Sequence, residues 1–181
     1  SLGEEAVSFL LYDHGFTILR DPKARLISAF RMRAHDPHHW RNPLNWFFYP
    51  WARLRGKDVF SIHVSRWHLS VDFDTWVWLM TRVILRFKPY LYDGHCLPQV
   101  KFIHPGHKIF LFEDGLEPVF RWIDAVTQTE PVAGNFHEMK VGLRQVTCSP
   151  ATDRRLRAYY AEDYALIEAV RAGQVPESHA A

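Results

Sequence analysis

The sequence predicts an α/β fold in which a parallel sheet is flanked by helices. Two short apolar runs bounded by turn residues, residues 15–20 (GFTILR) and 108–113 (KIFLFE), are typical of buried strands. Apolar residues at helical spacing occupy segments between and after these runs. Strands that alternate with helices favour a parallel sheet covered on both faces. The sequence therefore predicts that the two strands lie in one parallel sheet.

The first helix is predicted directly after the first strand. Asp21 can cap the free amides of a first turn, and Pro22 has the backbone geometry of a first helical position. Leu26, Ala29 and Phe30 then recur at helical spacing up to about Arg33. We expect this helix to pack on the sheet through Leu26 and Phe30.

Four further helices are predicted along the rest of the chain. They cover residues 58–68, 74–87, 115–127 and 152–172, and Asp74 is the expected cap of the second of them. The last helix brings together a row of large side chains close to one face: Leu156, Tyr159, Tyr160, Tyr164 and Ile167. We expect this face to dock on the body of the protein.

Composition bounds the class of protein. A chain of 181 residues with 48% hydrophobic residues is predicted to form a single domain over residues 1–181. No apolar stretch is long enough for a membrane span, and no signal peptide pattern is present. The net charge of +2 with dispersed basic residues disfavours nucleic acid, although arginines around residues 20–33 and 53–66 leave an anionic small molecule open. Two cysteines and no N-glycosylation sequon favour a cytoplasmic location.

Residues 35–51 are unlike the rest of the chain, with three prolines and six aromatic residues. This composition predicts a long ordered loop, which often covers a site. His35, His38 and His39 lie in it, but their spacing fits no closed tetrahedral set, and no metal is predicted. The tryptophans are predicted to be mostly core residues, with stacking on a sugar or adenine as the alternative for Trp40, Trp46 and Trp51.

Residues 20–30 read R-D-P-x-x-R-x-x-S-A-F at a strand end and in the helix that follows. This segment resembles the 3′-phosphate-binding segment of sulfotransferases that use 3′-phosphoadenosine 5′-phosphosulfate (PAPS). Ligands bind at the carboxyl ends of strands in open α/β sheets, and a guanidinium there can grip phosphate oxygens in a bidentate fork.

Three further segments carry the same resemblance. Residues 95–99 (HCLPQ) look like the H-x-x-P-Q segment of carbohydrate-type (family 2) sulfotransferases, and residues 108–116 look like their later strand ending in Glu-Asp. Residues 159–164 (YYAEDY) are similar to that family's C-terminal helix, and residues 72–76 resemble its Phe-x-x-Phe helix opening. Each motif is weak alone. Their common order and spacing, from about Gly15 to Ile167, is the specific signal.

The resemblance implies a core like that of P-loop NTPases and transfer of a sulfuryl group from PAPS to a hydroxyl acceptor, a carbohydrate or another small hydroxylated molecule, leaving PAP. It implies that Arg20 and Ser28 bind the 3′-phosphate, and His95 is the candidate catalytic base. The alternatives are structural: Arg20 pairs with Asp21 or a glutamate, Ser28 is a small packing residue, and His95 bonds a backbone carbonyl. The sequence does not indicate the identity of the acceptor or the oligomeric state.

One expected element has no counterpart in the sequence. The sulfotransferases that this chain resembles begin with a strand and a P-K-[TS]-[GA]-[ST]-[TS]-[ST] type loop whose amides hold the 5′-phosphosulfate. Residues 22–25 and 105–108 contain Pro and Lys but do not match that pattern. We therefore expect a chain that is incomplete at its N-terminus or a degenerate family member. A catalytically silent nucleotide- or glycan-binding module is the alternative function, and a nucleotide kinase ranks last because no Walker A loop is present.

Overall fold

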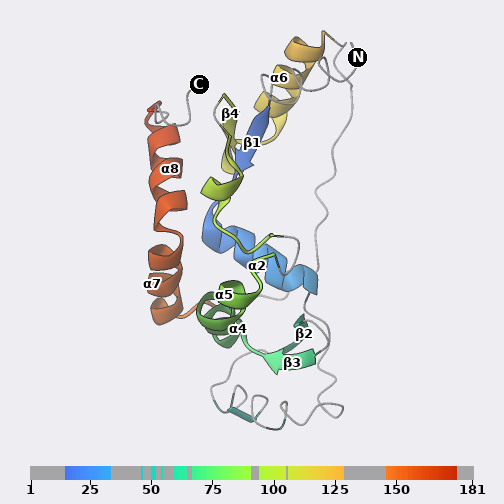
Figure 1. The fold of residues 1–181 in the computed structure, drawn as a ribbon, viewed down its shortest axis with the longest axis vertical. Coiled ribbons are helices and arrows are strands. Elements are labelled where there is room, and N and C mark those ends of the chain that lie inside the picture. The colour runs from blue at the N-terminus through green and yellow to red at the C-terminus, as the bar shows by residue number, and fades with distance from the viewer. Residues whose placement is uncertain are drawn as a thin grey trace. The chain divides into compact units, whose positions relative to one another are not determined.

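The computed structural model describes residues 15–33, 46, 50–51, 54, 59–64, 67–90, 94–104, 106–128 and 146–174 (Figure 1). The chain divides into two compact units. The first comprises Ser1–Pro22, Pro98–Glu138 and Ala161–Ala181, and the second comprises Lys23–Leu97 and Met139–Tyr160. The single domain expected from the sequence stays a prediction, and each unit is described by itself.

The first unit is built on two parallel strands, β1 (Phe16–Leu19) and β4 (Lys108–Leu111), which Figure 1 shows side by side. Their register pairs Phe16 with Lys108 and Leu19 with Leu111. β-branched and aromatic residues dominate both strands, and the last residue of each, Leu19 and Leu111, is buried, whereas the first residue of each is exposed. The predicted parallel pairing of the two apolar runs is confirmed, and the α/β class with it.

Helices and short turns also form part of the first unit. They are the 3₁₀ turns η3 (Gln99–Phe102) and η4 (Phe112–Asp114) and the helices α6 (Glu117–Thr127) and α8 (Ala161–Arg171). A core of buried side chains joins the strands, the segment after η3, and α8: Leu19, Ile103, Leu111, Leu166 and Ile167. Trp122 of α6 packs edge-on against Phe16 and Phe110, with ring centroids 5.5 and 6.0 Å away. Buried apolar area therefore holds both short strands in place.

The second unit contains most of the helix α2 (Pro22–Arg33), a hairpin and a second helical group. The hairpin strands are β2 (Phe60–Val64) and β3 (Trp67–Val71), and the helices are α4 (Phe73–Leu79), the π-helical turn η2 (Met80–Ile84), α5 (Leu85–Phe87) and α7 (Pro150–Tyr159). Phe30 is fully buried, and its ring centroid lies 5.4 Å from that of Phe73 and 5.2 Å from that of Trp76. Leu26 is also buried. The expected packing of α2 on the β1–β4 pair concerns both units and stays a prediction.

The prediction of a helix over residues 58–68 is wrong. This segment contains β2 and the start of β3, which pair antiparallel from Phe60 opposite Val71 to Val64 opposite Trp67. The sequence FSIHV alternates apolar and polar residues with the period of a strand, and WHLSV does the same after a two-residue connection. The alternation is a better guide here than the apolar content.

The predicted cap of the helix after the hairpin is also wrong by two residues. Asp72, not Asp74, is the N-cap of α4, and its side chain accepts a 2.6 Å hydrogen bond from the backbone N–H of Thr75. Asp74 instead accepts a bond from the backbone N–H of Ser149. The sequence has two acidic residues near the start of this helix. Their hydrogen bonds in the folded protein distinguish them: Asp72 accepts from Thr75, and Asp74 accepts from Ser149.

The single helix predicted over residues 152–172 is two helices. Tyr160 ends α7 with φ −106° and ψ 29°, outside helical geometry, and α8 begins at the next residue. The chain passes from the second unit to the first directly after Tyr160. The apolar spacing persists across this one-residue break, so periodicity does not reveal it.

Other expectations concern parts of the chain that are only partly described. Most of the predicted loop at residues 35–51, including His35, His38, His39 and Trp40, lies outside the described residues. Trp46 and Trp51 are exposed. Among the helices that the structure describes, none has the length and apolar character needed to cross a membrane.

Candidate functional site

The carboxyl ends of β1 and β4 form the first candidate site. Arg20 directly follows β1 and Phe112 directly follows β4, and Leu19 pairs with Leu111 just before them. The two residues therefore leave the same edge of the parallel pair. The Cζ atom of Arg20 lies 4.6 Å from the centroid of the Phe112 ring. A guanidinium over an aromatic face is held by a cation–π attraction, which orients it without using its hydrogen-bond donors.

The backbone of Arg20 is held by the side-chain amide of Gln99. The Arg20 N–H donates to Oε1 of Gln99 at 3.0 Å, and Nε2 of Gln99 donates to the Arg20 carbonyl at 2.7 Å. The next backbone N–H, that of Asp21, donates to Oε1 of Glu113 at 2.8 Å. Side chains from two other motifs of the sequence thus fix the strand end.

Gln99 is fixed in turn by Asp163 of α8. One carboxylate oxygen of Asp163 accepts from the N–H of Gln99 at 2.9 Å, and the other accepts from the N–H of Val100 at 3.0 Å. These amides belong to the first turn of η3, where N–H groups have no partner inside the helix. Asp163 is only 1% exposed, so the buried charge is compensated by these bonds. We call Arg20, Gln99, Glu113 and Asp163 the strand-end network.

The Arg20 side chain stands apart from this network. Its backbone makes the bonds to Gln99, while its half-buried guanidinium pairs with no carboxylate among the described residues. The alternative in which Arg20 pairs with Asp21 or a glutamate is not seen in that part of the chain. The arrangement can therefore offer guanidinium donors to an anion at the edge where ligands of parallel sheets bind.

The other two predicted site residues, Ser28 and His95, belong to the second unit, whereas Arg20 belongs to the first. Ser28 is half-buried in α2, and its hydroxyl has no hydrogen bond to any described residue. His95 is exposed in a turn, and its imidazole likewise makes no bond within the described ranges. The alternative role of His95, bonding a backbone carbonyl, is not seen there.

The turn that carries His95 is anchored by the two residues after it. The Cys96 carbonyl accepts a 2.6 Å bond from the Tyr160 hydroxyl, and the Leu97 carbonyl accepts a 2.6 Å bond from Arg25. Burial is the main cause that raises the pKa of the neighbouring Tyr159, and the Cys96 thiol adds to it. These contacts hold the backbone and leave the imidazole exposed to solvent.

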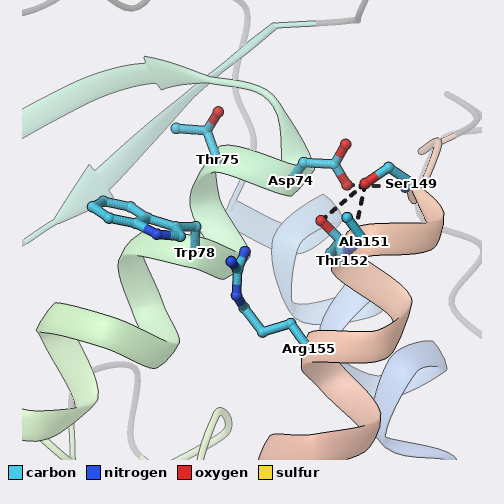
Figure 2. A pocket seen from close by; sticks show the side chains of 7 residues that line it. All are labelled: Asp74, Thr75, Trp78, Ser149, Ala151, Thr152 and Arg155. Atoms are coloured by element: carbon cyan, nitrogen blue, oxygen red, sulfur yellow. Dashed lines mark hydrogen bonds between the residues drawn. The ribbon is translucent and has the colours of Figure 1, made fainter.

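The second candidate site is a hollow of about 610 Å³ in the second unit (Figure 2). Its lining comes from α4 and from the start of α7: Asp74, Thr75, Trp78, Ser149, Thr152 and Arg155. The Ser149 hydroxyl caps α7 by accepting from the N–H of Thr152 at 3.3 Å. No motif in the sequence marked this hollow, because its two walls are far apart along the chain.

Charge around the start of α7 is balanced outside the hollow. Asp153 accepts a 2.6 Å bond from Lys23 and a 3.1 Å bond from Arg157, and these two hydrogen bonds lower the pKa of its carboxyl.

The described ranges contain no group of three or more His, Cys, Asp or Glu side chains arranged to hold a metal ion. Comparison with models of protein families, with curated proteins and with solved structures finds no match to this chain.

Proposed function

We propose that this chain is a sulfotransferase-like domain that binds a 3′-phosphoadenosine nucleotide at the carboxyl end of β1. In the complete reaction a sulfuryl group passes from PAPS to a hydroxyl acceptor, a carbohydrate or another small hydroxylated molecule. The observation that supports this proposal is how the backbone and the side chain of Arg20 are bonded. Its backbone is bonded to Gln99 on both sides, while its guanidinium has no carboxylate partner in the described residues.

A guanidinium so placed suits a phosphate for two reasons. Its planar fork can give two parallel hydrogen bonds to phosphate oxygens, and the fixed backbone reduces the entropy lost when the ligand binds. Ser28 would add a hydroxyl donor from α2. Because α2 rises about 1.5 Å per residue, Ser28 lies roughly 9 Å along the helix from its start. A phosphate lying beside the first two turns of α2 would meet the Ser28 hydroxyl.

The transfer itself would be direct and in line. The acceptor oxygen attacks sulfur, the bond from sulfur to the bridging phosphate oxygen breaks, PAP leaves, and a base takes the acceptor's proton. His95 is the candidate base, and its exposed imidazole can accept a proton from a bound hydroxyl. Backbone amides around the 5′-phosphosulfate stabilise the charge on the leaving oxygen, and the loop that supplies them in relatives is not within these 181 residues.

The experiment on nucleotide binding compares PAP with AMP by calorimetry. We expect PAP to bind more tightly, and we expect Arg20→Ala to remove the preference at a cost of about 1.5–3 kcal/mol for charged hydrogen bonds. This variant keeps the backbone bonds to Gln99, so it should fold. Arg121→Ala is the matched control, because Arg121 lies in the same unit and, among the described residues, pairs with Glu117 on the surface of α6. Equal affinity for PAP and AMP would contradict the assignment.

The experiment on transfer measures release of PAP from PAPS with a panel of hydroxylated acceptors. We expect no turnover from the 181-residue chain, because losing even one donor to such a charge typically costs about 10²–10³ in rate. A chain extended upstream by a P-K-[TS]-type loop should turn over, and His95→Asn should then slow it. An extended chain that binds PAP without turnover would favour the silent binding module.

A further inference from the structure

The hollow between α4 and α7 offers one cationic side chain that nothing described uses. Arg155 lines the hollow and is half-buried, and its guanidinium makes no ion pair or hydrogen bond with any residue that the structure describes. Figure 2 shows its side chain reaching from α7 toward α4. Its neighbour Arg154 is exposed and does not line the hollow. The two arginines therefore differ in setting although they are adjacent in sequence.

The acidic residue of the hollow is already engaged by the backbone. Asp74 is only 9% exposed, and its carboxylate accepts a 3.0 Å bond from the N–H of Ser149. Ser149 in turn caps α7 through Thr152. These bonds engage the N–H groups of Ser149 and Thr152 at the amino end of α7, and Arg155 is the cationic side chain that lines the hollow.

An aromatic wall stands on the other side of the same hollow. Trp78 of α4 lines it and is 46% exposed, although the two residues on either side of it in α4, Val77 and Leu79, are buried and half-buried. A large aromatic side chain left in solvent offers a flat apolar face for a ring. The volume of about 610 Å³ lies within the usual range for small-molecule sites.

From these observations we propose that the hollow binds a small ring compound bearing a carboxylate or sulfate. The ring stacks on Trp78, and the anionic group forms a bidentate pair with Arg155. Thr75 and Thr152 also line the hollow, and the Thr152 hydroxyl is hydrogen-bonded to that of Ser149. This inference uses none of the residues assigned to nucleotide binding, and its test is independent of the proposed function.

The experiment uses the ¹⁵N-labelled full chain and four probes at neutral pH. Benzoate and benzamide share an aromatic ring and differ in charge, while glucuronate and glucuronamide do the same for a sugar ring. The readout is the indole N–H signal of Trp78, identified by its loss in Trp78→Leu. The two pairs of probes distinguish an aromatic from a saccharide ring.

We expect at least one acid to shift the Trp78 signal and to bind about tenfold or more tightly than its own amide, as a charge-assisted pair requires. Arg155→Gln should make that acid and its amide equal, whereas Arg154→Gln should leave the preference unchanged. Three results would each overturn the proposal: acid and amide of equal affinity, a preference that survives Arg155→Gln, or a Trp78 signal that no probe moves at high millimolar concentration. If Arg155→Gln does not fold, the comparison of acid with amide in the unchanged chain decides.

Discussion

The two ends of the β1–β4 pair are held by different means. At the carboxyl end, the Gln99 amide and the Glu113 carboxylate bond to the backbone that follows β1. At the amino end, the chain is closely packed. The Lys108 N–H donates to the Gly15 carbonyl at 3.0 Å, and the ring of His107 lies so close to Gly15 that a Cβ there would clash with its Nε2 atom.

This difference shows how a short parallel pair is stabilised while the Arg20 guanidinium at its carboxyl end stays without a carboxylate partner among the described residues. Two strands of four residues each bury too little surface to hold together alone, so both ends need support. Packing a ring against the backbone, as His107 does, fills the space around the strand. The Gln99 side chain bonds to the Arg20 backbone, so it does not engage the Arg20 guanidinium.

Removing the charge that supports the carboxyl end should have the largest effect. Asp163→Asn keeps the shape of the side chain but turns an acceptor toward the Gln99 and Val100 amides into a donor. We expect a loss of about 2–3 kcal/mol in the free energy of unfolding, because buried N–H groups are left without acceptors. Urea unfolding measures the loss, and amide exchange should accelerate at these two residues. Glu162→Gln, at an exposed neighbouring position, should change neither.

Adding one methyl group at the amino end should have a smaller effect. Gly15→Ala forces the His107 ring to move and breaks its 3.0 Å hydrogen bond with the Thr17 hydroxyl. We expect a cost of about 1 kcal/mol from the lost bond, with some added strain. The double variant with His107→Ala is the control, since the cost of Gly15→Ala should disappear when the ring is absent. An equal cost in both backgrounds would show that the ring does not occupy this space.

The smallest expected effect is a pH dependence confined to the amino end. Burial, and then repulsion by His104, lowers the pKa of His107 below the 6.5 of an unperturbed histidine. The unfolded chain therefore takes up the proton first as the pH falls. The contribution of His107 to stability is complete above pH 6.5 and declines as the pH falls from there through the lowered folded-state pKa. Unfolding midpoints across this range should fall less steeply in His107→Gln, and identical slopes would contradict the prediction.

The sequence predicts the elements that have strong local signals. The strands at β1 and β4 are apolar runs with turn residues around them, and Pro22 marks the start of α2. Local signals do not separate Asp72 from Asp74 at the start of α4, because both can cap a helix. They also miss the break between α7 and α8 at Tyr160, whose hydroxyl donates a hydrogen bond to the Cys96 carbonyl. A local pattern cannot show a hydrogen bond to a residue 64 positions away.

The candidate site is predicted only in part for the same reason. Arg20 is found from its motif and its place after a strand. Gln99 and Asp163 lie in motifs noted in the sequence, but their bonds join residues 79 and 64 positions apart. A polar residue between apolar ones indicates that its side chain is buried with a hydrogen-bond partner, but it does not identify that partner. Trp78 and Arg155 carry no motif at all, and only the folded second unit brings them into one hollow.

The Asp163 bond to η3 also has a consequence for the order in which this protein folds. The bonds that hold the end of β1 span 79 and 92 positions, and the bond that holds Gln99 spans 64. Contacts of such long sequence separation cost loop entropy before they give any return, and they slow folding. On the ribosome, β1 emerges before η3 and α8, and its end stays without its full support until residue 163 has been added. The carboxyl end of β1 is thus among the last described parts of the first unit to gain its full support, although β1 precedes the rest of those parts in the sequence.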